Sequence, residues 1–112
     1  MKTVITKSFH FSASHTKAGR VIGKNYILEI SIEAVAPDQE ELFEKKVREN
    51  IIRPLESADL GLHVNFLAGI EVNDLNLVKA FWVELKKLCP DFKPQTLTLF
   101  RDSGTRTTLS IQ

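Results

Sequence analysis

The stretch Tyr26-Ile27-Leu28-Glu29-Ile30-Ser31-Ile32-Glu33-Ala34 alternates between two kinds of side chain. Its tyrosine, leucine, alternate isoleucines and alanine share one parity, and the glutamates and the serine fall on the other. Because successive side chains of a strand point to opposite faces, this period predicts a long strand with one buried face.

A second alternating run precedes this strand. Ile5, Phe9, Phe11 and Ala13 share one parity, which Lys7 interrupts. The two runs together predict a hairpin of long strands. The connection from Thr16 to Gly23 contains two glycines and basic side chains, so we expect a loop there, and a candidate binding loop.

Helical spacing begins after Pro37. Asp38 with Glu41 three residues later forms a capping-box pattern, and apolar residues recur at helical intervals until Pro54. Residues 58–71 then mix glycine, asparagine and apolar side chains without a clean period. We expect one helix followed by a packed irregular loop.

A second helix is expected to begin at a cap formed by Asn73 or Asp74, and its wide apolar stripe ends at Pro90. Two strands close the chain, at residues 96–101 and 105–111, joined by a short turn through Ser103-Gly104. The order strand, strand, helix, helix, strand, strand predicts an α+β fold, with a four-stranded antiparallel sheet that carries both helices on one face.

Composition narrows the class of protein. The 112 residues, 43% of them hydrophobic, suffice for one core, so residues 1–112 are expected to form a single domain. Fifteen basic and fourteen acidic residues leave no block of like charge, which argues against nucleic-acid binding. No apolar run is long enough to span a membrane, and a single cysteine excludes an internal disulfide. These features favour a cytoplasmic protein.

Two short segments have a more specific pattern. Phe9-His10-Phe11-Ser12-Ala13-Ser14-His15 and Ile22-Gly23-Lys24-Asn25-Tyr26 resemble the opening of the 6-pyruvoyl-tetrahydropterin synthase family, which includes the 6-carboxytetrahydropterin synthases. In that family one strand provides a first zinc histidine at the position of His15, and the next strand provides two more from alternate residues. The resemblance implies the tunnelling fold, in which subunits join their sheets edge to edge into a barrel, commonly as trimers stacked into hexamers.

The zinc ligands implied by the resemblance are mostly replaced. Ile22 and Lys24 stand where the second and third histidines would be. Isoleucine cannot ligate a metal, and a protonated lysine has no free lone pair. A catalytic zinc normally has three protein ligands, so the sequence predicts that zinc is absent and that no other cofactor takes its place.

The resemblance continues through Ile51 to Trp82 and the strand that ends at Arg101, again with changed functional positions. Glu56 and Ser57 stand where the family has the Asp-His pair of its proton relay, and Ala18 stands where it usually has a catalytic cysteine. In the family's Pro-Thr-x-Glu-Asn segment, at residues 72–76 here, only Asn76 is retained. Arg101 and Asp102 take the place of the Glu-Thr pair whose glutamate binds the pterin. An arginine has only donors to offer, which disfavours a pterin bound in that manner.

The ligand-binding candidates are His15, Lys24, Arg101, Arg20 and Asn76. If the cations among them converge, the pocket suits a small anionic or acceptor-rich ligand. Each also has an ordinary structural interpretation: a histidine bonded to the backbone, a solvated strand lysine, or an arginine paired with Asp102 or with a carboxylate at a subunit interface.

Three functions remain open. The first is an oligomeric binding scaffold, a trimer or hexamer, that has lost the synthase chemistry and has no catalytic residues. The second is an active carbon-oxygen lyase of the pterin synthase type, acting on dihydroneopterin triphosphate. The third is a changed enzyme that uses Lys24, Glu56 or His15 without a metal, although no Ser-His or Cys-His spacing supports it. We favour the first, since identical neighbouring subunits cannot supply residues that the sequence lacks.

Overall fold

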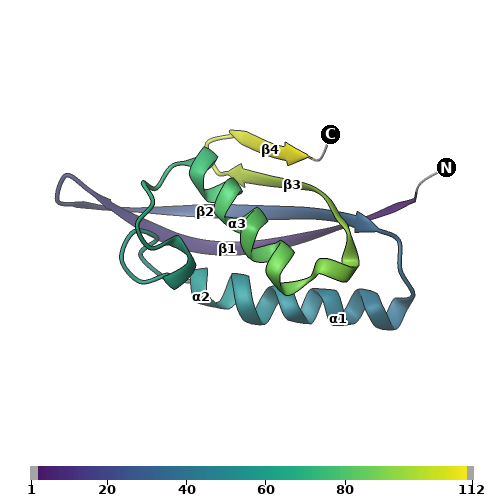
Figure 1. The fold of residues 1–112 in the computed structure, drawn as a ribbon. Helices are drawn as coiled ribbons and strands as arrows, with labels where there is room; N and C mark the ends of the chain where they lie inside the picture. Colours follow the sequence, from purple (N-terminus) through teal and green to yellow (C-terminus); the bar gives the residue numbers. More distant parts are fainter. Residues whose placement is uncertain (1–2, 111–112) are drawn as a thin grey trace.

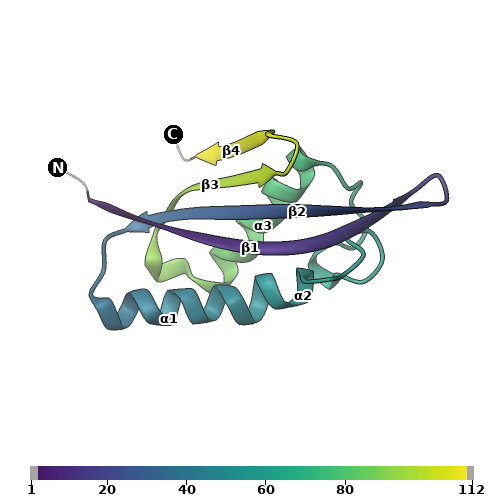
Figure 2. The ribbon, with the colours of Figure 1, turned by 180° about the vertical axis from the view of Figure 1, so that it is seen from behind.

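The computed structural model describes residues 3–110, which form a four-stranded antiparallel sheet with strand order β1-β2-β3-β4 (Figure 1). β1 (Val4–Lys17) and β2 (Arg20–Glu33) are fourteen residues long, whereas β3 (Pro94–Arg101) and β4 (Arg106–Ser110) are shorter. The helices lie on one face of the sheet, and Figure 2 shows the strands in front of α3 when the molecule is viewed from behind. The predicted order of elements is confirmed. The last strand was expected to reach Ile111, which lies outside the described residues.

The hairpin of β1 and β2 extends past the rest of the molecule (Figures 1 and 2). The two strands pair without a break from Val4 opposite Glu33 to Lys17 opposite Arg20. Only Ala18 and Gly19 connect them, both with positive φ (52° and 75°), which is the geometry of a tight type I′ turn. The expected loop from Thr16 to Gly23 was therefore wrong: strand pairing continues through it, and we call residues 14–23 the arm.

The core lies between the sheet and the helices. Phe11 stacks on Tyr26 with ring centroids 4.9 Å apart, and Phe81 of α3 packs edge-on against Phe11. Every strand position predicted to face inward on β2 between residues 26 and 32 is buried. The inward side chains of the first three strands are Phe9, Phe11, Ala13, Tyr26, Leu28, Ile30, Ile32, Leu97 and Leu99.

The first helical segment begins earlier than its capping pattern predicts. α1 (Pro37–Val47) has Pro37 in its first turn and Ala36 as its N-cap, with no side-chain cap. Proline is favoured at that position because its missing N–H would have no partner there. A π-helical turn (Arg48–Ile52) and α2 (Arg53–Leu55) continue the segment. Pro54 cannot donate to the preceding turn, and the helix widens there, with Arg53 N–H bonded to the carbonyl of Arg48.

The second helix matches its predicted cap. α3 (Asp74–Leu88) starts at Asn73, whose Oδ1 accepts a hydrogen bond from the Asn76 N–H (2.8 Å). The helix ends at Cys89, which is buried, and burial raises the pKa of that thiol. Between the helical segments, the chain is irregular apart from a short 3₁₀ turn (Asn65–Leu67), as expected. No helix of residues 3–110 is long and apolar enough to cross a membrane.

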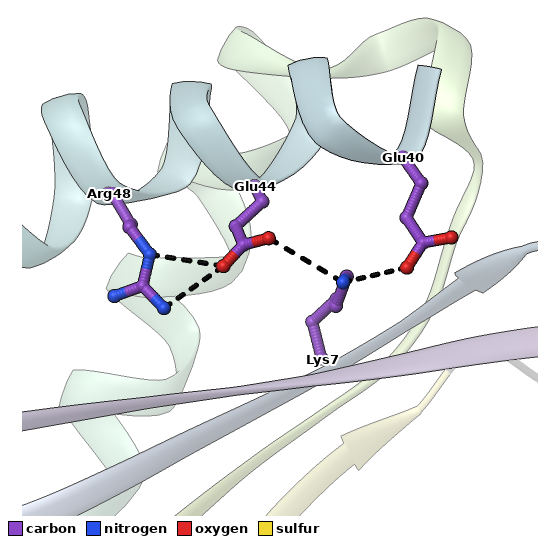
Figure 3. A network of polar contacts seen from close by, with 4 residues as sticks. All are labelled: Lys7, Glu40, Glu44 and Arg48. Atoms are coloured by element: carbon purple, nitrogen blue, oxygen red, sulfur yellow. Dashed lines mark hydrogen bonds and ion pairs between the residues drawn. The ribbon is translucent and has the colours of Figure 1, made fainter. Parts of the chain in front are cut away.

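Lys7 breaks the apolar alternation of β1 because it pairs with α1. Its ammonium lies 2.7 Å from Glu40 and 3.5 Å from Glu44, and Arg48 binds Glu44 at 3.0 Å (Figure 3). The hydrogen bond that Lys7 donates to Glu40 raises the pKa of Lys7, and the hydrogen bond that Arg48 donates to Glu44 lowers the pKa of Glu44. This network holds α1 against the sheet at its β1 edge.

The turn at Ala18 gives the first prediction. An alanine in the left-handed region is strained, whereas asparagine tolerates it, and Asn-Gly is the favoured type I′ pair. We expect Ala18→Asn to stabilise the protein on the order of 1 kcal/mol, which would raise Tm by about 3–6 °C. Differential scanning calorimetry measures this shift. Ala68→Asn, at a residue with φ of −60°, is the control and should give no increase. A lower Tm for Ala18→Asn would contradict the assigned turn.

Candidate functional site

The register of the β1–β2 hairpin determines how His15, Ile22 and Lys24 lie relative to one another. These are the three positions of the zinc site that the resemblance implies. Ile22 lies directly opposite His15, and Lys24 lies two residues further along β2, opposite Ala13. By strand alternation all three side chains share the helix-facing side, and diagonal neighbours of this kind have Cα atoms roughly 7–8 Å apart. The register therefore brings these three side chains to one face of the hairpin.

These residues do not fit a zinc ion. One imidazole remains, beside an aliphatic side chain and an ammonium that offers no lone pair in its charged form. Within residues 3–110 no group of three histidine, cysteine, aspartate or glutamate side chains is arranged to hold a metal. The donor set at these three positions therefore does not match that of a catalytic zinc site.

A buried carboxylate lies beside His15 that the sequence did not single out. Asp59 is 8% exposed, its Oδ2 accepts a hydrogen bond from the Thr16 hydroxyl (2.6 Å), and its Oδ1 accepts one from the Gly61 N–H (2.9 Å). The Thr16 bond is the largest of the effects that lower the pKa of Asp59, and the charges of His63 and His15 act in the same direction. Asp59 thus ties the arm to the loop that follows α2.

The same loop forms the outer neighbour of β1. The Ser57 N–H donates to the carbonyl of Ser12 (2.6 Å), the Ser14 N–H donates to Ala58, and the Leu60 N–H donates back to Ser14. Glu56 joins this pairing through its side chain, since its Oε1 accepts from the Ser12 N–H at 3.0 Å. One oxygen of the Glu56 carboxylate is therefore committed to a backbone bond.

Arg101 is neutralised inside the chain. Its Nε lies 2.6 Å from the Oδ2 of Asp74, the first residue of α3, and the two side chains are 26% and 20% exposed. Within residues 3–110 the partner of Arg101 is therefore Asp74 and not the predicted Asp102, and the alternative of an interface carboxylate stays a prediction. Asp102 instead accepts from the Asn25 N–H (3.3 Å) and donates its own N–H to the carbonyl of Asn25. Arg101 therefore adds little net charge to the expected group of cations.

The remaining candidates lie in separate places. Lys24 lines a cavity of about 290 Å³ that also has the hydroxyl-bearing residues Ser12, Ser14 and Ser57 on its walls. Arg20 is exposed at the tip of the arm, opposite Lys17. Neither Lys24 nor Arg20 forms an ion pair with a carboxylate of residues 3–110.

Asn76 does not belong to this group. Its N–H is bonded to Asn73, and its side-chain amide donates to the carbonyl of Glu71 (2.9 Å). It lines a different cavity, between the start of α3 and the preceding loop. The structure therefore places Asn76 in the first turn of α3, where Asn73 caps its backbone N–H and its side chain is bonded to the preceding loop.

Comparison with known proteins bears on the fold. No protein-family model and no curated protein sequence matches the chain. A solved structure of Caenorhabditis elegans 6-pyruvoyl tetrahydropterin synthase is similar, with a TM-score of 0.80, 14% identity, and coverage of 98% of this chain and 96% of that one. The fold expected from the sequence is confirmed.

Asp59 gives a prediction about pH. Asp59→Asn keeps one acceptor oxygen but places its amide NH₂ against one of the two groups that donate to Asp59, the Thr16 hydroxyl or the Gly61 N–H. We therefore expect a loss of about 2 kcal/mol in the free energy of unfolding at pH 7. Because the folded pKa lies below the unfolded value, this contribution is present above the unfolded pKa and disappears as pH falls through the folded pKa.

Urea unfolding at pH 7 and at pH 3 tests this. The difference between the wild type and Asp59→Asn should shrink at the lower pH, whereas the exposed control Glu41→Gln should show little difference at either pH. Equal differences at both values would show that the charge of Asp59 is not what holds the arm to the loop.

Proposed function

We propose that this chain is a binding scaffold with the fold of a pterin synthase, and that it lacks the zinc-dependent synthase reaction. The observation that carries the proposal is the pairing of His15 with Ile22 across the hairpin, with Lys24 in the third ligand position. Two of the three metal ligands are replaced by side chains that cannot bind zinc under ordinary conditions.

The positions of the proton relay support the same proposal. Glu56 is bonded to the β1 backbone, and Ser57 has no group that titrates near neutral pH. Ala18, at the position of the family's cysteine, is a turn residue at the tip of the arm. The one cysteine, Cys89, is buried at the end of α3, where a nucleophile could not reach a ligand in the arm.

The proposed ligand at the Lys24 cavity is small and anionic or rich in acceptors. The ammonium of Lys24 supplies donors, and Arg20 lies on the same side of β2 by strand alternation, whereas the hydroxyls of Ser12 and Ser14 already donate to Asn25 and Ala58. Arg101 takes no direct part, because Asp74 holds its guanidinium.

We further propose that the subunits join edge to edge as a trimer or a trimer-based hexamer. Beyond residues 56–60, the outward backbone groups of β1 at Thr6, Ser8 and His10 have no backbone partner among residues 3–110. β4 forms the opposite edge of the sheet. Unpaired sheet edges of this kind are covered in many proteins by a neighbouring chain.

Restoring the ligands tests the loss of the metal. We expect the purified wild-type protein to contain less than about 0.1 zinc per chain, and Ile22→His/Lys24→His to contain about one, because that variant restores a three-histidine site on adjacent strands. Elemental analysis after dialysis against zinc buffer and then metal-free buffer measures both. A matched control is Val21→His/Gly23→His, on the opposite side of β2, which should not gain zinc. Stoichiometric zinc in the wild type would refute the proposal.

Lys24 is tested separately with inorganic phosphate as the probe. Since a charge-assisted hydrogen bond is lost, Lys24→Gln should weaken phosphate binding about tenfold by isothermal titration calorimetry. Lys79→Gln, an exposed lysine of α3, should leave it unchanged. Equal affinities for the wild type and Lys24→Gln would place the anion elsewhere.

A further inference from the structure

The sheet face opposite the helices carries another cavity, of about 340 Å³, near the point where β3 ends. Phe11 and Tyr26 contribute only backbone to it, because both side chains are 3% exposed and packed in the core. The side chains that turn toward this open face alternate with them, and they place Ile27 and Phe100 next to each other as an apolar floor.

Carboxylate oxygens without partners lie around this floor. Glu56 uses Oε1 to accept from Ser12, and Asp102 uses Oδ2 to accept from Asn25. The second oxygen of each carboxylate has no hydrogen-bond partner within the described part of the chain, and neither residue forms an ion pair there. The second oxygen of each carboxylate can therefore accept hydrogen bonds from a ligand.

The nearby cations do not neutralise these carboxylates. Arg101 contributes backbone at this face, while its guanidinium is on the helix side, bonded to Asp74. Arg106 of β4 lies over the ring of Phe100, 6.0 Å from its centroid, and is not part of the cavity wall. That contact shows that the Phe100 ring can accept a positive charge, as aromatic faces commonly do. Of the side chains that do line the cavity, His10 is the remaining titratable one.

We infer that this open-face cavity binds a small organic cation with a flat apolar body, such as an amidine or a guanidine. The N–H groups of the cation would donate to the free oxygens of Glu56 and Asp102, and its body would lie on Ile27 and Phe100. This preference is opposite to that of the Lys24 cavity, although the two cavities share Ser12 and Asn25 on their walls. The inference does not depend on the absence of zinc or of synthase activity.

Benzamidine is the probe, and sodium benzoate is its matched anion of similar shape. Titration of ¹⁵N-labelled protein should show saturable amide shifts at Ser12, Asn25 and Asp102 with benzamidine and none there with benzoate. Glu56→Gln and Asp102→Asn each remove the charge but keep an oxygen that can accept the existing backbone bond. Together they should weaken benzamidine binding at least about tenfold.

A carboxylate on the same face but outside the cavity provides the control. Glu29→Gln lies further along β2, where the Glu29 side chain accepts from Ser8, and it should leave the affinity for benzamidine within about twofold. Arg106→Gln should strengthen binding, because it removes a competing cation from the Phe100 ring. The inference is overturned if benzoate produces the same shifts, or if the double variant binds benzamidine as well as the wild type does.

Discussion

The unbroken pairing of β1 with β2 is the constraint on which the rest of the structure depends. Fourteen residue pairs run from Val4 to Lys17, and a shift of one residue would move every inward side chain to the open face. This register stacks Phe11 on Tyr26 above Phe81, and it also sets Ile22 opposite His15. The core and the altered ligand site are thus consequences of the same pairing.

Several residues at or near positions that are functional in the pterin synthase family form structural bonds in this chain. Glu56 closes the outer edge of β1, Asp59 ties the arm to the loop, and Arg101 joins the end of β3 to the start of α3. Each of these polar groups is held in place by a specific bond rather than left available in the Lys24 cavity. Within residues 3–110, what remains without a partner is the ammonium of Lys24 on the helix-facing side and, on the open face, the second oxygen of the Glu56 and Asp102 carboxylates.

The sequence predicted the strands and helices where one face is buried, because burial imposes a readable period on the side chains. It failed in the arm, where the hairpin extends past the helices and neither face needs apolar residues; Val21, at 72% exposed, illustrates this. The bonds of Arg101 to Asp74 and of Asp59 to Thr16 could not be predicted either. They join residues 27 and 43 positions apart, and only the three-dimensional packing of helix, loop and sheet brings them together. Lys7 breaks the period for the same kind of reason, since its partners are on α1.

Native mass spectrometry of the purified protein, sprayed from a volatile buffer without chelator, tests the central claim that the fold persists without the metal chemistry. The account predicts an assembly whose mass is a whole multiple of three chains and that contains no zinc. An assembly with one zinc ion for each chain would contradict it, because Ile22 and Lys24 beside His15 would then not have removed the zinc site.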